Sequence, residues 1–226
     1  MKRAFLSSLL LLLITISGFD SPQQKILIVG DSISIGYTPY VWKYFQGKAM
    51  VTHNPGNGQH TGTGLEKIEE WIGDEDWDLI QLNWGLWDLV YRHPDSKAYG
   101  NRDKVNGKAT FTIDEYASNL DSLITKIIEL SDAKLIFVTT SYVPEEEIGR
   151  FSSDPEKYNA AAKAVMQKHG VAVNDIYEDS KVIHKAHGIG SNDVHYTEKG
   201  SVELGKLIVS FMEKELYGAT SNSLPD

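Results

Sequence analysis

Short apolar runs rich in β-branched residues recur along the chain and alternate with longer segments of helical spacing. The runs cover residues 25–30, 49–53, 78–82, 134–140 and 171–174. Apolar runs of this length, bounded by turn signals, are typical of buried strands. Because strands that alternate with helices form βαβ units, the pattern predicts a five-stranded, mostly parallel sheet. With helices on both faces, the fold class is a three-layer α/β/α sandwich.

Helix boundaries are predicted from capping residues. A capping box pairs Ser or Thr with Glu three residues later, and proline is favoured in a first turn. The predicted helix starts are Thr63, Thr112, Asp154 and Thr197, and the last two helices end at Gly170 and Gly218. Residues 91–111 form one long irregular stretch, and loops of that length are usually functional or mobile.

The first twenty residues have a different character. Lys2 and Arg3 precede an apolar run over residues 5–16, which is typical of a secretory signal peptide. The run is too short to span a bilayer, so we expect no stable membrane insertion. We predict a signal peptide at residues 1–20, a single domain at residues 21–226 and a periplasmic or secreted bacterial protein. A retained N-terminal anchor is the alternative.

Composition excludes several classes of function. The 226 residues include no cysteine, which excludes disulfides, thiolate metal sites and cysteine nucleophiles. The formal net charge of −9 argues against a nucleic-acid partner. No complete phosphate-binding Gly-x-x-x-x-Gly-Lys-Ser/Thr motif is present, and we expect neither a metal nor a cofactor.

Reactive side chains follow the predicted strands, where an open α/β sheet binds its ligands. Ser32 lies in the turn after the first strand, where a nucleophile also offers its own N–H to an oxyanion; an ordinary helix cap is the alternative. Glycine- and asparagine-rich turns follow the second and third strands. Before the last helix, His195 has Asp193 two residues away, a base with a carboxylate to orient it.

The joint pattern resembles the SGNH, or GDSL-type, hydrolase superfamily. The resemblance rests on Gly30-Asp31-Ser32, on the two turns and on Asp193-Val194-His195, in the expected order. It covers essentially the whole chain after residue 24 and implies a flavodoxin-like fold. The Gly-Leu-Trp-Asp-Leu stretch from residue 85 and Tyr158-Asn159 are similar to a branch of secreted bacterial esterases.

The resemblance implies roles for three positions. Ser32 matches the nucleophile, whose N–H is also an oxyanion donor, and His195 matches the base. Gly58 matches a second backbone donor, with Gly56 as the alternative.

Two positions depart from the superfamily pattern. The third block normally reads Gly-x-Asn-Asp, but Trp87 stands where the oxyanion asparagine belongs. We expect the Asn83 amide to donate instead, with the Trp87 indole N–H as the alternative. The acid is expected at residue 192, which is asparagine, so Asp193 is predicted to complete the triad, with Asn192 as the alternative.

Aromatic residues and the long loop suggest the substrate. Trp84 and Trp87 are expected to bind it by stacking on a sugar or covering an acyl chain, although at least one of them could instead pack in the core. The stretch over residues 91–111, with Arg92 and His93, would overhang the pocket. We predict a serine esterase for short acyl esters, such as acetyl groups on carbohydrates. A catalytically degraded glycan-binding relative and a flavodoxin-type binding module are the alternatives.

Overall fold

Five parallel strands form the central sheet of the computed structural model, which describes residues 23–218. Their order across the sheet is β2-β1-β3-β6-β7, and every adjacent pair is parallel. Counted along the chain, this is the order 2-1-3-4-5 of flavodoxin-like sheets. The strands are β1 (Gln24–Val29), β2 (Ala49–His53), β3 (Leu79–Leu82), β6 (Lys134–Val138) and β7 (Ala172–Asn174).

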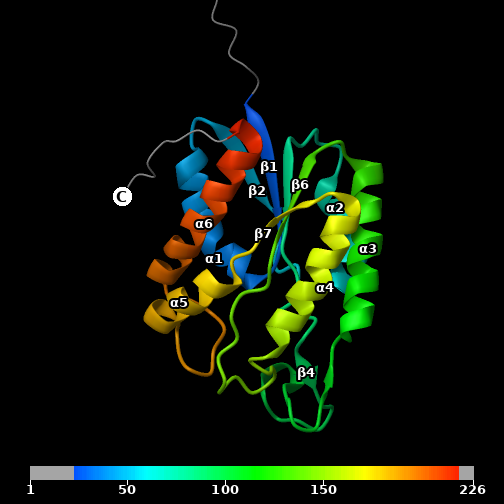
Figure 1. Ribbon diagram of the computed structural model, residues 1–226, viewed down its shortest axis with the longest axis vertical. Coiled ribbons are helices and arrows are strands. Elements are labelled where there is room, and N and C mark those ends of the chain that lie inside the picture. Colours follow the sequence, from blue (N-terminus) through cyan, green and yellow to red (C-terminus); the bar gives the residue numbers. More distant parts are fainter. Residues whose placement is uncertain (1–22, 219–226) are drawn as a thin grey trace, which may run out of the picture.

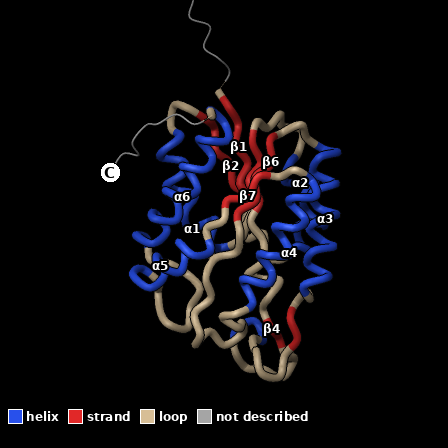
Figure 2. The backbone as a smooth tube through the Cα atoms, viewed as in Figure 1, coloured by secondary structure: helices blue, strands red, loops and turns tan. Residues whose placement is uncertain are grey.

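Helices cover both faces of the sheet, which confirms the three-layer α/β/α prediction. In Figure 1, α1, α5 and α6 lie on one side of the strands, and α2, α3 and α4 lie on the other. Figure 2 shows the same three layers as helix, strand and helix. The helices are α1 (Ser32–Phe45), α2 (Thr61–Ile72), α3 (Ile113–Leu130), α4 (Asp154–His169), α5 (Tyr177–His187) and α6 (Glu198–Tyr217).

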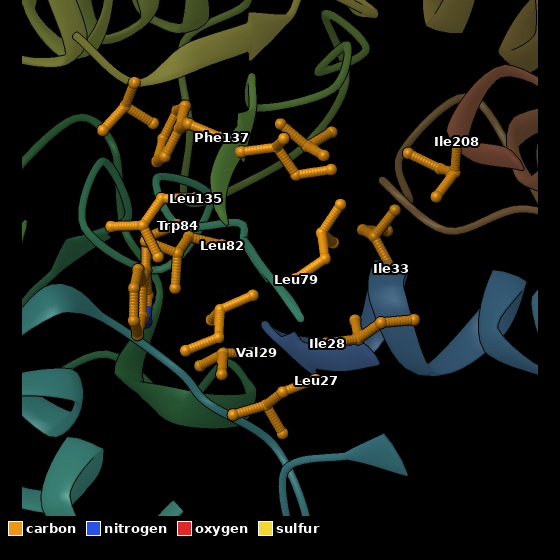
Figure 3. Close-up of a cluster of buried hydrophobic side chains, with 14 of the residues drawn as sticks. Leu27, Ile28, Val29, Ile33, Leu79, Leu82, Trp84, Leu135, Phe137 and Ile208 are labelled. Carbon is orange, nitrogen blue, oxygen red and sulfur yellow. The ribbon is translucent and has the colours of Figure 1, made fainter. Parts of the chain in front are cut away.

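The core lies on both faces of the sheet. Strand β3 is buried along its whole length, as expected of a central strand with helices above and below. Figure 3 shows Ile33 of α1 beside Ile208 of α6 on one side of the strands and Trp84 on the other. All three side chains are at most 6% exposed. Alternate residues of each strand therefore have apolar partners on opposite faces.

Three of the four predicted helix starts are confirmed. Thr112 forms a complete capping box with Glu115, Thr197 caps α6, and α4 begins at Asp154. The capping box predicted at Thr63 is wrong. His60 is the N-cap of α2 and accepts from the Thr63 N–H, so the helix begins three residues earlier than the predicted cap implies.

The stretch over residues 91–111 is more ordered than predicted. Strands β4 (Tyr91–Arg92) and β5 (Lys108–Ala109) pair in an antiparallel fashion, and a short 3₁₀ helix, η1 (Tyr99–Asn101), lies between them. We call this stretch the 91–111 segment. Figure 1 shows β4 and its neighbouring loops beyond the carboxyl ends of the sheet strands. The segment is therefore placed where the fold binds ligands.

The predicted signal peptide at residues 1–20 lies outside the described residues. Among the helices within residues 23–218, none is long and apolar enough to cross a membrane.

Candidate active site

Ser32 is the first residue of α1, directly after the turn that ends β1. The cap of α1 is Asp31, whose carboxylate accepts from the Ile33 N–H at 2.9 Å. The turn is fixed from the neighbouring strand, because Gly30 N–H donates to the Asn54 side chain at 2.8 Å. Asp31 therefore caps the helix, and the Ser32 hydroxyl stays available for other partners.

A chain of hydrogen bonds joins three of the predicted residues across 163 positions of sequence. Ser32 Oγ lies 2.9 Å from His195 Nε2, and His195 Nδ1 lies 2.5 Å from Asp193 Oδ1. A carboxylate only accepts, so Nδ1 carries the proton and Nε2 of the neutral ring accepts from the serine hydroxyl. The partner of the histidine ring is thus Asp193, and Asn192 does not occupy that place.

Asp193 is held in position by its own segment. Its carboxylate also accepts from the backbone N–H of His195 at 2.9 Å, and its carbonyl oxygen lies 2.7 Å from His184 Nε2. Partial burial would raise the pKa of this carboxyl, but the two hydrogen bonds from His195 and the charges of His195 and Arg102 outweigh it. The pKa of Asp193 is therefore lowered, and the carboxylate is ionised at neutral pH.

These residues open into a pocket of about 430 Å³ at the carboxyl ends of the strands. Its wall combines the turns after β1, β2 and β3 with the 91–111 segment and the turn before α6. The predicted overhang of the 91–111 segment is thus present, although His93 does not line the pocket. The lining residues are Ser32, Asn57, Leu86, Trp87, Arg92, Tyr99, Gly100, Arg102, Arg150, Asp193, Val194 and His195.

Gly58 is not free to act as the oxyanion donor expected of it. Its N–H donates to the Gly30 carbonyl oxygen at 2.8 Å. A Cβ at position 58 would lie 2.6 Å from that same oxygen. The glycine is required because the turn after β2 packs directly against the turn that carries Ser32. Its role is structural, and the alternative, Gly56, does not line the pocket either.

The structure also corrects the expectation for Asn83. Its side-chain amide donates to the carbonyl oxygens of Val138 and Thr139, at 3.0 and 3.4 Å. Both amide hydrogens are therefore used to join the ends of β3 and β6. The residue is 6% exposed and absent from the pocket wall.

Of the two candidate tryptophans, Trp84 lies in the core and Trp87 lies at the pocket wall. Trp84 is fully buried and its indole N–H donates to the Gly58 carbonyl at 3.2 Å, so the expectation that it binds substrate is wrong. Trp87 is partly exposed and lines the pocket. The Arg92 guanidinium lies 5.5 Å from the centre of the Trp87 ring, within the range of a cation–π contact.

Two other donors belong to residues that line the pocket. Ser32 N–H lies in the first turn of α1, where backbone N–H groups have no intrahelical acceptor. Asn57 lines the pocket, and its Oδ1 accepts from the Gln59 N–H at 2.8 Å. The Asn57 NH₂ group has no acceptor among the described residues, so it remains available as a donor at the pocket wall. The only sequence signal for Asn57 was its place in the turn after the second strand.

The described residues offer no site for a metal ion. Within residues 23–218, no three imidazole or carboxylate groups come together in a way that could hold one.

Solved structures share this fold. A lipase/acylhydrolase from Enterococcus faecalis has a TM-score of 0.69 at 20% identity, over 88% of this chain and 100% of its own. An acetylxylan esterase from Geobacillus stearothermophilus has a TM-score of 0.66 at 17% identity, over 88% and 97%. A GDSL-like lipase from Bacteroides thetaiotaomicron has a TM-score of 0.59 at 16% identity, over 85% and 89%.

At these identities the likeness establishes the fold, which is that of the GDSL-like lipases, acylhydrolases and acetyl xylan esterases. The resemblance inferred from the Gly-Asp-Ser and Asp-Val-His blocks is confirmed at this level. No protein-family model matches the chain, and no curated protein does.

Proposed function

We propose that this protein is a serine esterase that hydrolyses short acyl esters through an acyl-enzyme. The observation that carries the proposal is the continuous hydrogen-bonded chain from Ser32 through His195 to Asp193 at the wall of the pocket. The same residues are the ones that the sequence motifs single out. A degraded, purely glycan-binding relative would not need this chain of contacts, so the geometry favours the enzyme.

In the proposed first step, Ser32 Oγ attacks the ester carbonyl as His195 Nε2 takes the hydroxyl proton. Asp193 accepts the hydrogen bond from Nδ1–H, fixes the tautomer and stabilises the imidazolium that forms. The carbonyl oxygen becomes an oxyanion. Ser32 N–H, at the positive end of α1, and the Asn57 amide are the two donors placed to hold it.

In the second half, the imidazolium of His195 gives its proton to the leaving alcohol, and the acyl group remains on Ser32. Water then enters, His195 takes one of its protons, and the resulting hydroxide attacks the acyl carbonyl. Collapse of this second oxyanion releases the acid and returns the proton to Ser32 Oγ. The scheme needs only groups that already line the pocket.

An acetyl ester on a carbohydrate is the proposed substrate. A pocket of about 430 Å³ is at the small end of ligand sites, which suits a short acyl group and a sugar better than a long chain. The partly exposed Trp87 ring lines the pocket and offers an apolar face of the kind on which a sugar ring packs. Acetyl xylan esterases among the structural neighbours support the same class.

Export of the protein is also proposed, from the basic and apolar start of the chain. Mass spectrometry of protein recovered from the periplasm or medium is expected to show the loss of about the first twenty residues.

The test of the esterase proposal is turnover of 4-nitrophenyl acetate by the wild type and two serine variants. Ser32→Ala is expected to abolish turnover without loss of the fold. Ser34→Ala is the matched control, because the Ser34 hydroxyl donates to the Asp31 carbonyl and lies outside the pocket. Equal turnover by wild type and Ser32→Ala would contradict the proposal.

A further inference from the structure

Arginine is distributed very unevenly in this chain. The sequence has four arginines and 18 lysines, and only Arg92, Arg102 and Arg150 fall within residues 23–218. All three line the pocket that contains Ser32, whereas no lysine does. The three positions come from different parts of the chain, two from the 91–111 segment and one from the segment that precedes α4. A protein of net charge −9 thus gathers cations of one kind at one place.

Arg150 is held rigidly at the inner wall. The residue is 6% exposed, its Nε donates to the Leu86 carbonyl at 2.7 Å, and its Nη1 donates to Glu147 at 3.1 Å. No acceptor for its Nη2 is present among the described residues. The unused N–H groups of this guanidinium are available to an acceptor in the pocket, and a hydrogen bond to a charged acceptor is stronger than one between neutral groups.

The other two arginines, Arg92 and Arg102, are less buried than Arg150. Arg102 Nη1 donates to the same Glu147 oxygen at 2.9 Å, so Glu147, which is fully buried, is shared between two cations. Arg92 donates to the Gly100 carbonyl and lies over Trp87, and no carboxylate pairs with it in the described residues. Each guanidinium therefore keeps donors that the protein itself does not use.

The pocket wall carries three guanidinium groups and one carboxylate, Asp193, which is engaged by His195. Glu147 is shared by Arg102 and Arg150, and the buried Asp31 also acts on the charge of Arg150. Burial lowers the pKa of Arg92, and the nearby charge of Arg102 lowers it further. Burial also lowers the pKa of Arg150, and the charges of Arg102 and Arg92 add to this effect. The three guanidinium groups therefore repel one another, and a bound anion would relieve this repulsion.

Resting on the esterase function proposed above, we propose that the pocket selects esters whose sugar part carries a carboxylate, such as O-acetylated uronic acids. The carboxylate binds the free N–H groups of Arg92, Arg102 and Arg150, and the sugar ring lies against Trp87. The planar guanidinium fork matches a carboxylate in a bidentate manner, which an ammonium group cannot do. A phosphate shares this chemistry, and binding measurements distinguish the two anions.

The test is a comparison of two substrates that differ in one group. Monoacetylated methyl galacturonoside and monoacetylated methyl galactoside differ only in a carboxylate against a hydroxymethyl group at C6. The wild type is expected to release acetate from the uronoside with a kcat/KM at least about tenfold higher, the effect of one charge-assisted hydrogen bond. Added salt is expected to reduce the ratio.

Single substitutions test which residues cause the preference for the uronoside. Arg102→Gln and Arg92→Gln are each expected to lower the ratio of kcat/KM for the uronoside to kcat/KM for the galactoside severalfold, because each removes donors for the carboxylate. Lys97→Gln is the matched control, since it removes a cation from the same 91–111 segment but from an exposed position outside the pocket. Its substrate ratio is expected to equal that of the wild type.

Binding to Ser32→Ala separates the possible anions without any chemistry. Titration with galacturonate, galactose 6-phosphate and galactose is expected to give the tightest binding for galacturonate. Tighter binding of the phosphate would overturn the carboxylate assignment. Equal kcat/KM for both acetylated sugars, with normal Ser32-dependent hydrolysis of 4-nitrophenyl acetate, would overturn this inference and leave the esterase standing. Loss of that hydrolysis as well would instead overturn the esterase proposal.

Discussion

At the scale of single residues, the donors around Ser32 are the part of the site that differs most from expectation. Gly58 and Asn83 both lie near the carboxyl edge of the sheet, yet each gives its N–H groups to backbone carbonyls. Asn57 lines the pocket, its oxygen accepts from the Gln59 N–H, and it is the donor that we propose in place of Asn83. Substitution of Asn57 is therefore expected to lower kcat, and substitution of Asn83 is expected to lower stability.

Asn57→Ala is expected to lower kcat by roughly 10²–10³ with little change in KM, because the lost donor acts mainly on the oxyanion. Steady-state kinetics with 4-nitrophenyl acetate measure this. Asn83→Ala is the matched comparison. It removes a buried link between β3 and β6 and is expected to lower the melting temperature while the folded protein keeps most of its kcat. The reverse pattern would restore Asn83 as the donor.

Asp193→Asn is expected to reduce kcat by up to about 10⁴ with the fold retained, because an amide can hold the histidine in the wrong tautomer. Asn192→Ala changes the adjacent residue, which does not contact the ring, and is expected to cost little. Circular dichroism checks the fold and steady-state kinetics give kcat. A larger loss for Asn192→Ala than for Asp193→Asn would mean that the residue orienting His195 has been misassigned.

The hydrogen-bonded residues could be predicted from sequence because the signals are local. Gly-Asp-Ser ends a strand and Asp-Val-His precedes a capped helix, so each block carries its own structural context. The second proposed oxyanion donor, Asn57, and the three pocket arginines could not be predicted in this way. Whether Asn83 faces a pocket or a neighbouring carbonyl depends on β6, more than fifty residues away, and the arginines converge only through the tertiary fold.

At the scale of elements, buried strands and strong caps were predictable, and polar or short elements were not. The five strands follow from their apolar runs, and α3 follows from its capping box. Helix α5 was not predicted, because its polar sequence lacks a wide apolar stripe and a side-chain cap. The strands β4 and β5 are two residues each, too short for any alternation to show.

Thr112→Ala is expected to destabilise the protein by about 1 kcal/mol, because it removes the capping hydroxyl of α3. Urea denaturation gives the change in unfolding free energy. Thr63→Ala is the control: Thr63 lies inside α2, where alanine is the better helix former, so a loss well below that of Thr112→Ala is expected. Equal losses of unfolding free energy in the two variants would mean that the Thr112 cap does not contribute significantly to stability.

At the scale of the whole molecule, a buried carboxyl group links helix α2 to the turn after β3. Asp88 is fully buried, and its Oδ1 accepts from the Thr61 hydroxyl and N–H at 2.5 and 3.0 Å. Its Oδ2 has no partner among the described residues. Burial raises the pKa of Asp88 to about 7, although the Thr61 hydrogen bonds oppose the shift.

The raised pKa of Asp88 predicts that the folded protein loses stability as pH rises. Between an unfolded pKa of about 4 and the folded value of about 7, the folded state holds a proton that the unfolded state has released. Stability should therefore fall across this range, by up to about 1.4 kcal/mol per pH unit from this group. Denaturation of wild type and Asp88→Asn from pH 4 to 8 measures the difference. A difference that does not vary with pH would contradict the assignment.

The central claim is that Ser32, made nucleophilic by His195, forms a covalent intermediate, and labelling by a fluorophosphonate tests it most directly. The account predicts one label per chain, located on Ser32 by peptide mass spectrometry, with strongly slowed labelling in a folded His195→Ala variant. Ser34→Ala should label as the wild type does. Labelling at another residue, or none in folded protein that still hydrolyses 4-nitrophenyl acetate, would contradict the account.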